Sequence, residues 1–223
     1  MFENLVENAT LRSVRMHYNF NSQDLIIKLM PSVEHNIPVA ALTKFITMKS
    51  MAMGLDLFSL CQIDTTTCKG VSSAKEGDGA LKPIPARRQR LDWPTIVIEC
   101  GVSESLAKLR MDASWWLTNS CGEVRIIIVI TLTLAAEKLA IEKWKLVASN
   151  DQITRSCPAE APGLVTRLEI SRAAADSKFV ASDELGIEFS DLMLRPPIPP
   201  EQDLVFSKMD LERFMETALS GLQ

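Results

Sequence analysis

The stretch Pro94-Thr-Ile-Val-Ile-Glu99-Cys-Gly101 predicts a buried strand that carries one charged side chain near its end. A second acid, Asp78, lies upstream in the polar stretch Ser72-Ser-Ala-Lys-Glu-Gly-Asp78-Gly-Ala80. A buried carboxylate needs a partner, because an unpaired charge inside a protein is costly. A divalent cation is an economical partner for two converging carboxylates. These two stretches therefore predict a metal-centred site.

The segments around this strand predict a mixed sheet. A helix capped by Ser103 or Ser105 is expected to run to about Thr118, and a long apolar strand follows from Glu123 to Leu134. A strand–helix–strand passage is a parallel crossover by default. The other predicted elements are strands at 25–29, 55–63, 79–81, 139–147 and 164–170, a short mixed segment at 185–194, and helices at 33–53 and 210–220. The fold class is α/β or α+β.

Length and composition favour one globular domain in a reducing compartment. The 223 residues, with 47% hydrophobic residues and a net charge of −4, predict an arm at 1–24 and a single domain at 25–223. A C-terminal extension is expected from about residue 150. No apolar run approaches the ~18 residues of a membrane span, and no signal peptide is evident. We therefore expect an intracellular protein, cytoplasmic or nuclear, without membrane contact.

The residue counts also weigh against several kinds of site. Five cysteines without CxxC spacing and only two histidines favour neither a disulfide framework nor a zinc site. A nucleic-acid-binding protein usually has a basic surface, whereas this chain is acidic overall. Its basic cluster, residues 87–90, is interpreted as a solvated loop in preference to a phosphate contact.

The element order and several short segments resemble the PD-(D/E)XK, or restriction-endonuclease-like, nuclease superfamily. More narrowly, they resemble a branch common in filamentous fungi. The segments that carry the resemblance are 30–35, 72–78, 94–105, 109–117, 141–144 and 194–197, within about residues 25–215. The resemblance implies a mixed β-sheet flanked by helices, with the core order αβββαβ and extra C-terminal strands and a helix. It also implies a Mg²⁺- or Mn²⁺-dependent phosphodiesterase that acts on DNA or RNA.

By this resemblance, Asp78 and Glu99 are the metal-binding and catalytic carboxylates, and Glu34 is an auxiliary metal-binding acid. The chain departs from the motif in two places. Gly77 stands where the motif has proline before the aspartate, and Gly101 stands where it has lysine two residues after the glutamate. A basic group is still required to stabilise charge on the phosphate.

Some members of the superfamily supply this basic group from the following helix. Lys108 is the first candidate for the catalytic lysine here, and Arg110 is the second. Lys108 also lies one turn from Glu104 and one turn from Asp112, so a ladder of i,i+4 ion pairs is an equally good interpretation.

Other side chains are more simply explained by packing. Trp115 and Trp116 are expected to pack at the end of the helix in preference to stacking on bases. Cys100 is expected to face the core, because neighbouring residues of a strand point to opposite faces. A nucleophilic cysteine served by His17 or His35 is a remote alternative.

Two functions remain open at the level of sequence. The first is the metal-dependent nuclease, with possible loss of activity through the altered motif. The second is a nuclease fold reused as an enzyme that acts on a small molecule or as a binding or scaffold module, because one fold can host unrelated functions. A homodimer is compatible with either function.

Overall fold

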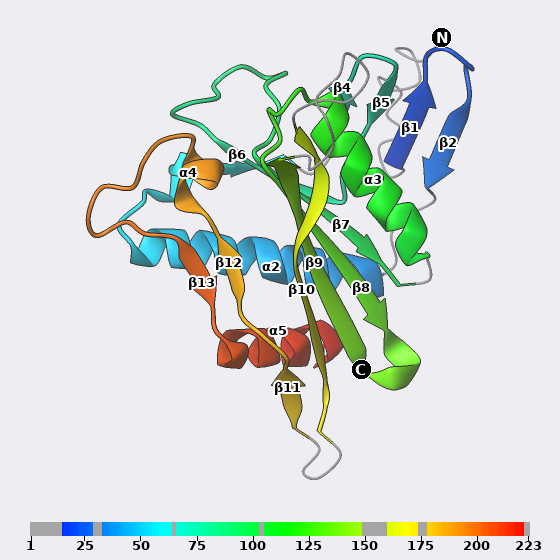
Figure 1. Ribbon diagram of the computed structural model, residues 1–223. Helices are drawn as coiled ribbons and strands as arrows, with labels where there is room; N and C mark the ends of the chain where they lie inside the picture. Colours follow the sequence, from blue (N-terminus) through cyan, green and yellow to red (C-terminus); the bar gives the residue numbers. More distant parts are fainter. Residues whose placement is uncertain are drawn as a thin grey trace.

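The computed structural model describes residues 15–28, 33–63, 66–102, 105–148, 160–173 and 178–220. Within these residues, the centre of the molecule is a seven-stranded mixed sheet in the order β11-β10-β9-β8-β7-β6-β3 (Figure 1). Its strands are β3 (Leu60–Gln62), β6 (Gly79–Pro83), β7 (Ile96–Gly101), β8 (Ile126–Thr133), β9 (Lys138–Ala148), β10 (Glu160–Arg172) and β11 (Phe179–Ala181). The helices are α2 (Val33–Ala52), α3 (Leu106–Asn119), α4 (Phe189–Met193) and α5 (Lys208–Ser220).

The centre of the sheet is the parallel pair that the sequence predicted. β7 and β8 run parallel, with Ile96 paired to Ile126 and Glu99 paired to Val129, and α3 connects them. β8 is buried on both faces for most of its length, as expected for a strand between two covering layers. The other pairings in the seven-stranded sheet are antiparallel. The prediction of a mixed sheet flanked by helices is confirmed.

The two faces of β7 belong to two hydrophobic clusters. Ile96, Ile98 and Cys100 contribute to the larger cluster, which also contains residues of α2, α4 and α5. Val97 lies in the smaller cluster with the buried residues of α3. Figure 1 shows α3 on one side of the sheet and α2 with α5 on the other. Glu99 shares the face of Val97, so its side chain is directed toward α3.

The predicted core order is also present, as α2-β3-β6-β7-α3-β8. The N-terminal part of the chain was predicted incompletely. The arm expected at 1–24 is not irregular throughout, because Arg15–Asn19 form β1. The sequence patterns also did not predict β4 (Cys68–Lys69) and β5 (Ser73–Lys75). These strands join β2 (Leu25–Lys28) in a four-stranded sheet of order β2-β1-β5-β4. Each of them is short, and the β1–β5 pairing joins segments far apart in sequence.

The C-terminal part continues the same sheet. β10 pairs with β9 over most of its length, and β11 closes the edge. The short mixed segment at 185–194 forms β12 (Leu185–Ile187) followed by α4, and β12 pairs with β13 (Leu204–Phe206). Among the helices of the described residues, none is long and apolar enough to cross a membrane. The division into an arm and a domain stays a prediction, and residues 1–14 lie outside the described part.

The packing around β8 makes a quantitative prediction for stability. Ile128 is fully buried in the middle of this strand, so Ile128→Ala removes apolar contacts that cannot be replaced. We expect its free energy of unfolding, from chemical denaturation, to fall by about 2–5 kcal/mol. Val180→Ala is the control, because Val180 is 49% exposed on the edge strand β11, and it should change stability by less than about 0.5 kcal/mol. Equal effects of the two substitutions would contradict the assignment of β8 as the core strand.

Candidate functional site

The two predicted carboxylates start from facing positions of neighbouring strands. Asp78 immediately precedes β6, and Glu99 lies in β7. Gly79 pairs with Ile98 in the antiparallel register of these strands, so the next step outward brings Asp78 opposite Glu99. Both residues are buried. The sequence alone predicted this pairing of two acids on adjacent strands.

Asp78 is held by the backbone of β7 and by α2. The Cys100 N–H donates a hydrogen bond to Asp78 Oδ2 at 2.9 Å. His35 Nε2, from the first turn of α2, lies 3.1 Å from the same oxygen. The orientation of the Asp78 carboxylate is therefore set from two elements at once.

Glu99 belongs to a buried cluster of charged groups, which we call the Lys75 cluster: Lys75, Glu99, Asp112 and Trp116. Lys75 Nζ lies 3.0 Å from Glu99 Oε1 and 2.7 Å from Asp112 Oδ1. The Trp116 Nε1–H donates to Glu99 Oε1 at 2.6 Å, and its ring centroid lies 5.7 Å from Lys75 Nζ. The side chains of Lys75 and Glu99 are only 3% and 1% exposed. Such a cluster is stable only while its opposite charges stay together.

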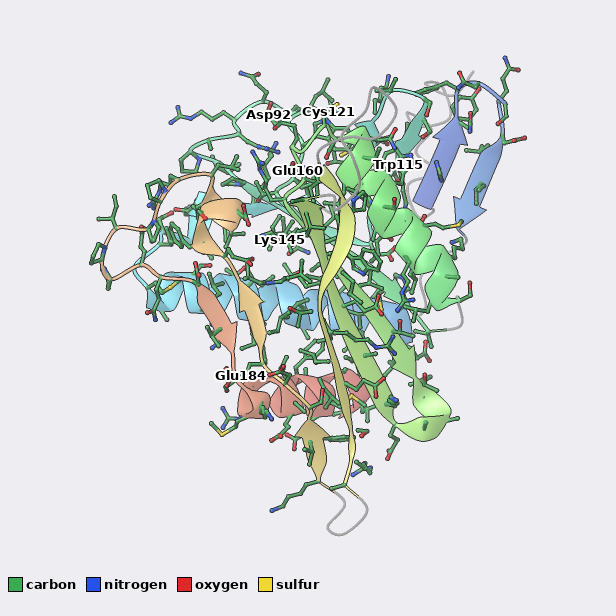
Figure 2. All side chains as sticks on the ribbon, viewed as in Figure 1. Asp92, Trp115, Cys121, Lys145, Glu160 and Glu184 are labelled. Carbon is green, nitrogen blue, oxygen red and sulfur yellow. The ribbon has the colours of Figure 1, made fainter. Side chains whose placement is uncertain are left out.

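The N-terminal sheet positions Lys75. β5 carries Lys75 and pairs with β1, where His17 lies directly opposite. The Trp115 Nε1–H of α3 donates to Ser73 Oγ at 2.6 Å, which ties β5 to α3. Figure 2 shows Trp115 beside α3, on the side of this sheet. Burial, and next the charge of Lys75, lower the pKa of His17, which is therefore mainly neutral near pH 7.

Close packing explains the glycine at position 77. A Cβ atom there would lie 2.9 Å from Val97 Cγ1 and 3.4 Å from the Trp116 ring. The side chain of a proline would therefore collide with β7 unless the strand moved. Val97 of β7 and Trp116 of α3 lie so close to residue 77 that glycine fits there better than the proline of the motif.

Lys108 and Arg110, the two basic candidates from the sequence, have other partners. Lys108 is 37% exposed in its side chain, and its Nζ lies 3.9 Å from Asp112 Oδ2, as the i,i+4 interpretation predicted. Arg110 donates to both oxygens of Glu142 on β9, at 3.0 and 2.5 Å. This hydrogen bonding raises the pKa of Arg110. The lysine that contacts Glu99 directly is Lys75.

The sequence analysis did not predict that Lys75 is part of the site or that Asp112 is buried against it. Both residues stand inside segments that carried the resemblance, 72–78 and 109–117. The available signal was Lys75 three residues before Asp78, but its inward orientation depends on β5, which was not predicted. Asp112 was considered only as a partner of Lys108. The second partner of Asp112 is Lys75, which lies on β5, far away in sequence.

The metal-binding roles of Asp78, Glu99 and Glu34 stay predictions. Glu34 is half-buried in the first turn of α2, next to His35. No group of three or more His, Cys, Asp or Glu side chains in the described residues has the arrangement of a metal site. Asp78 and Glu99 offer the hard oxygen donors that Mg²⁺ accepts, and Mg²⁺ commonly uses one or two carboxylates together with water and phosphate oxygens.

The basic cluster at 87–90 is partly structural. Arg87 is buried and donates to the carbonyl oxygens of Trp93, Pro94 and Glu123. It also forms an ion pair with the Glu123 carboxylate at 2.6 Å. An open groove of about 980 Å³ lies against this arginine, and no member of the Lys75 cluster lines it. Both terminal nitrogens of Arg87 are therefore already occupied by protein acceptors.

Thiol catalysis is not favoured by the placement of the cysteines. Cys100 is fully buried in the hydrophobic core, on the strand face opposite Glu99, as predicted. Cys68 on β4 lies nearer to the site, since it pairs with Lys75 across β4 and β5. Burial, and next the charge of Glu76, raise the pKa of Cys68 to about 12. Its thiol is therefore protonated at neutral pH and is a poor nucleophile.

Comparison with known proteins gives one distant structural likeness. No family model matches the chain, and no curated protein matches it. A solved structure from Anabaena variabilis ATCC 29413, described as "a putative nuclease belonging to DUF820", is similar over 90% of both chains. It is 11% identical, with a TM-score of 0.48, so it decides nothing about activity or substrate. No match connects the chain to the filamentous-fungal branch.

The raised pKa of Cys68 predicts slow alkylation. At pH 8, iodoacetamide should modify the exposed Cys121 well before Cys68, because only the thiolate reacts. Peptide mass spectrometry over time measures both rates in the same sample. Denatured protein is the control, in which the two residues should react at similar rates. Equal rates in the folded protein would contradict the burial of Cys68.

The Lys75 cluster predicts a large cost for removing its cation. Lys75→Met leaves Glu99 and Asp112 without the ammonium they share, so we expect a loss of about 3–5 kcal/mol in unfolding free energy. Lys108→Met is the matched control and should cost less than about 1 kcal/mol, since Lys108 is partly exposed. Adding Glu99→Gln and Asp112→Asn to Lys75→Met should recover part of the loss. A fully stable Lys75→Met variant would show that the cluster is not a charged network.

Proposed function

We propose that this protein is a metal-dependent phosphodiesterase of the nuclease type that acts on DNA or RNA. The observation that carries the proposal is the contact between Lys75 and Glu99, opposite Asp78 on the neighbouring strand. Two carboxylates and a lysine at this end of β6 and β7 are the groups that such hydrolysis requires. Lys75 provides the basic group that Gly101 cannot provide.

Each residue has a distinct task in this proposal. Asp78 and Glu99 would hold Mg²⁺ or Mn²⁺, with Glu34 as the auxiliary acid. The bound metal supplies a more acidic water and neutralises charge on the phosphate. Lys75 stabilises negative charge that develops on the phosphate, in place of Lys108. His35 orients the Asp78 carboxylate from α2.

A second candidate is a nuclease fold retained without nuclease chemistry. The favouring observation is the near-complete burial of the Lys75 cluster, in which one ammonium already neighbours two carboxylates. A cluster of this kind can serve the fold alone. The protein would then be a binding or scaffold module, or an enzyme for a small molecule. The filamentous-fungal branch, an intracellular location and a homodimer are further parts of the proposal in either form.

Calorimetric titration of Mg²⁺ and Mn²⁺ tests the proposal first. Wild-type protein should bind the metal, and the variant Asp78→Ala with Glu99→Ala should not, because both proposed ligands are removed. Metal-dependent cleavage of labelled DNA and RNA oligonucleotides is measured in parallel. Lys75→Met should still bind metal and should lose cleavage by about 100-fold or more, as expected for loss of a group that stabilises the transition state.

Lys108→Met is the control in this series and should cleave at nearly the wild-type rate, since the Lys108 side chain is 37% exposed and its 3.9 Å contact with Asp112 is much longer than that of Lys75. Circular dichroism establishes that each variant is folded. No binding at millimolar metal and no cleavage by the wild type would reject the nuclease in favour of the second candidate.

A further inference from the structure

Asp112 makes the shorter of the two contacts to Lys75. The distance from Lys75 Nζ is 2.7 Å to Asp112 Oδ1 and 3.0 Å to Glu99 Oε1. Asp112 is buried on the inner face of α3, and the resemblance assigned it no role. A carboxylate placed this close to a buried ammonium largely decides where that ammonium lies.

One turn of α3 contacts both Lys75 and Glu99. Asp112 contacts Lys75, and Trp116, four residues later on the same helix face, donates to Glu99 Oε1. The oxygen that accepts from Trp116 is also the one nearest Lys75 Nζ. The helix therefore fixes the lysine and the glutamate relative to each other.

We propose that Asp112 is a positioning residue that holds Lys75 in place for the reaction. The inference rests on the proposed function. In that reaction Glu99 would share its charge with a metal ion, and its attraction for Lys75 would be weaker. Asp112, 2.7 Å from Lys75 Nζ, then holds the ammonium in position, because Asp112 is not a proposed metal ligand. A lysine side chain has a flexible four-carbon stem and needs such a contact to be held at one point.

Apart from Glu99, Asp112 is the acidic side chain that contacts Lys75 and can hold its ammonium in position. Among the described residues, Lys75 has Glu99 of β7 and Asp112 of α3 as its acidic neighbours. It pairs across strands with His17 of β1 and with Cys68 of β4, whose thiol is neutral. His17 and Lys108 carry no negative charge. Lys108 lies 3.9 Å from the other oxygen of Asp112, on the more exposed side. The contact of Asp112 with Lys108 is therefore the weaker of its two cation contacts.

Asp112→Asn tests the inference, because it removes the charge and keeps the size of the side chain. Two readouts are measured on the full chain: kcat and KM for Mn²⁺-dependent oligonucleotide cleavage, and the NMR signal of the Lys75 ammonium in protein labelled with ¹⁵N-lysine. Lys75→Met assigns that signal. We expect kcat to fall by about 100-fold, as misplacement of a catalytic group does, with KM nearly unchanged. The ammonium signal should broaden or disappear.

Asp112→Glu and Thr118→Ala complete the experiment. The first retains the carboxylate and should restore part of kcat and of the signal, and the second, at an exposed position of α3, should change neither. A sharp Lys75 signal and a wild-type kcat in Asp112→Asn would overturn the inference. Absence of cleavage by the wild type would instead overturn the proposed function. In that case, loss of the Lys75 ammonium signal in Asp112→Asn would still show that Asp112 holds Lys75 in place.

Discussion

The buried ammonium of Lys75 connects the parts of the molecule that surround the site. It joins β5, β7 and α3 through Glu99 and Asp112. Taking three charges out of water is expensive, and only their mutual attraction offsets that cost. Each carboxylate therefore depends on the ammonium, which joins the helix, the central sheet and the N-terminal sheet together with the Trp115–Ser73 and Trp116–Glu99 hydrogen bonds.

The residues on either side of Asp78 impose a second constraint. A Cβ atom at Gly79 would lie 2.5 Å from Val39 Cγ1 of α2, and one at Gly77 would approach Val97 and Trp116. The two helix layers thus come close to the chain from opposite faces of the sheet, immediately before and after the carboxylate. Asp78 lies between these two close approaches, and its carboxylate contacts His35 and accepts a hydrogen bond from the Cys100 N–H. The Gly-Asp-Gly sequence reflects packing as much as chemistry.

Sequence patterns predicted those elements whose cause is local. The apolar runs of β7 and β8 and the cap at Ser105, whose side chain accepts from the Lys108 N–H, define the crossover without reference to the rest of the chain. β1, β4 and β5 are short, and the β1–β5 pairing that unites them joins segments far apart in sequence, so periodicity did not reveal them. Lys75 was missed for the same reason. Helical spacing shows which residues share a helix face, whereas the inward direction of Lys75 arises from strand pairing.

The distribution of charge bears on how such a site would select a substrate. The chain carries a net charge of −4, and Arg87 is committed to backbone carbonyls and Glu123. A broad attraction to the phosphate backbone, which gives nonspecific nucleic-acid binding its strength, is therefore weak in this protein. In the proposed reaction, recognition of the phosphodiester would then depend on local contacts at the site more than on the overall charge of the protein. A site of that kind favours a substrate that can enter a buried, charge-compensated centre, and it disfavours indiscriminate attack on exposed duplexes.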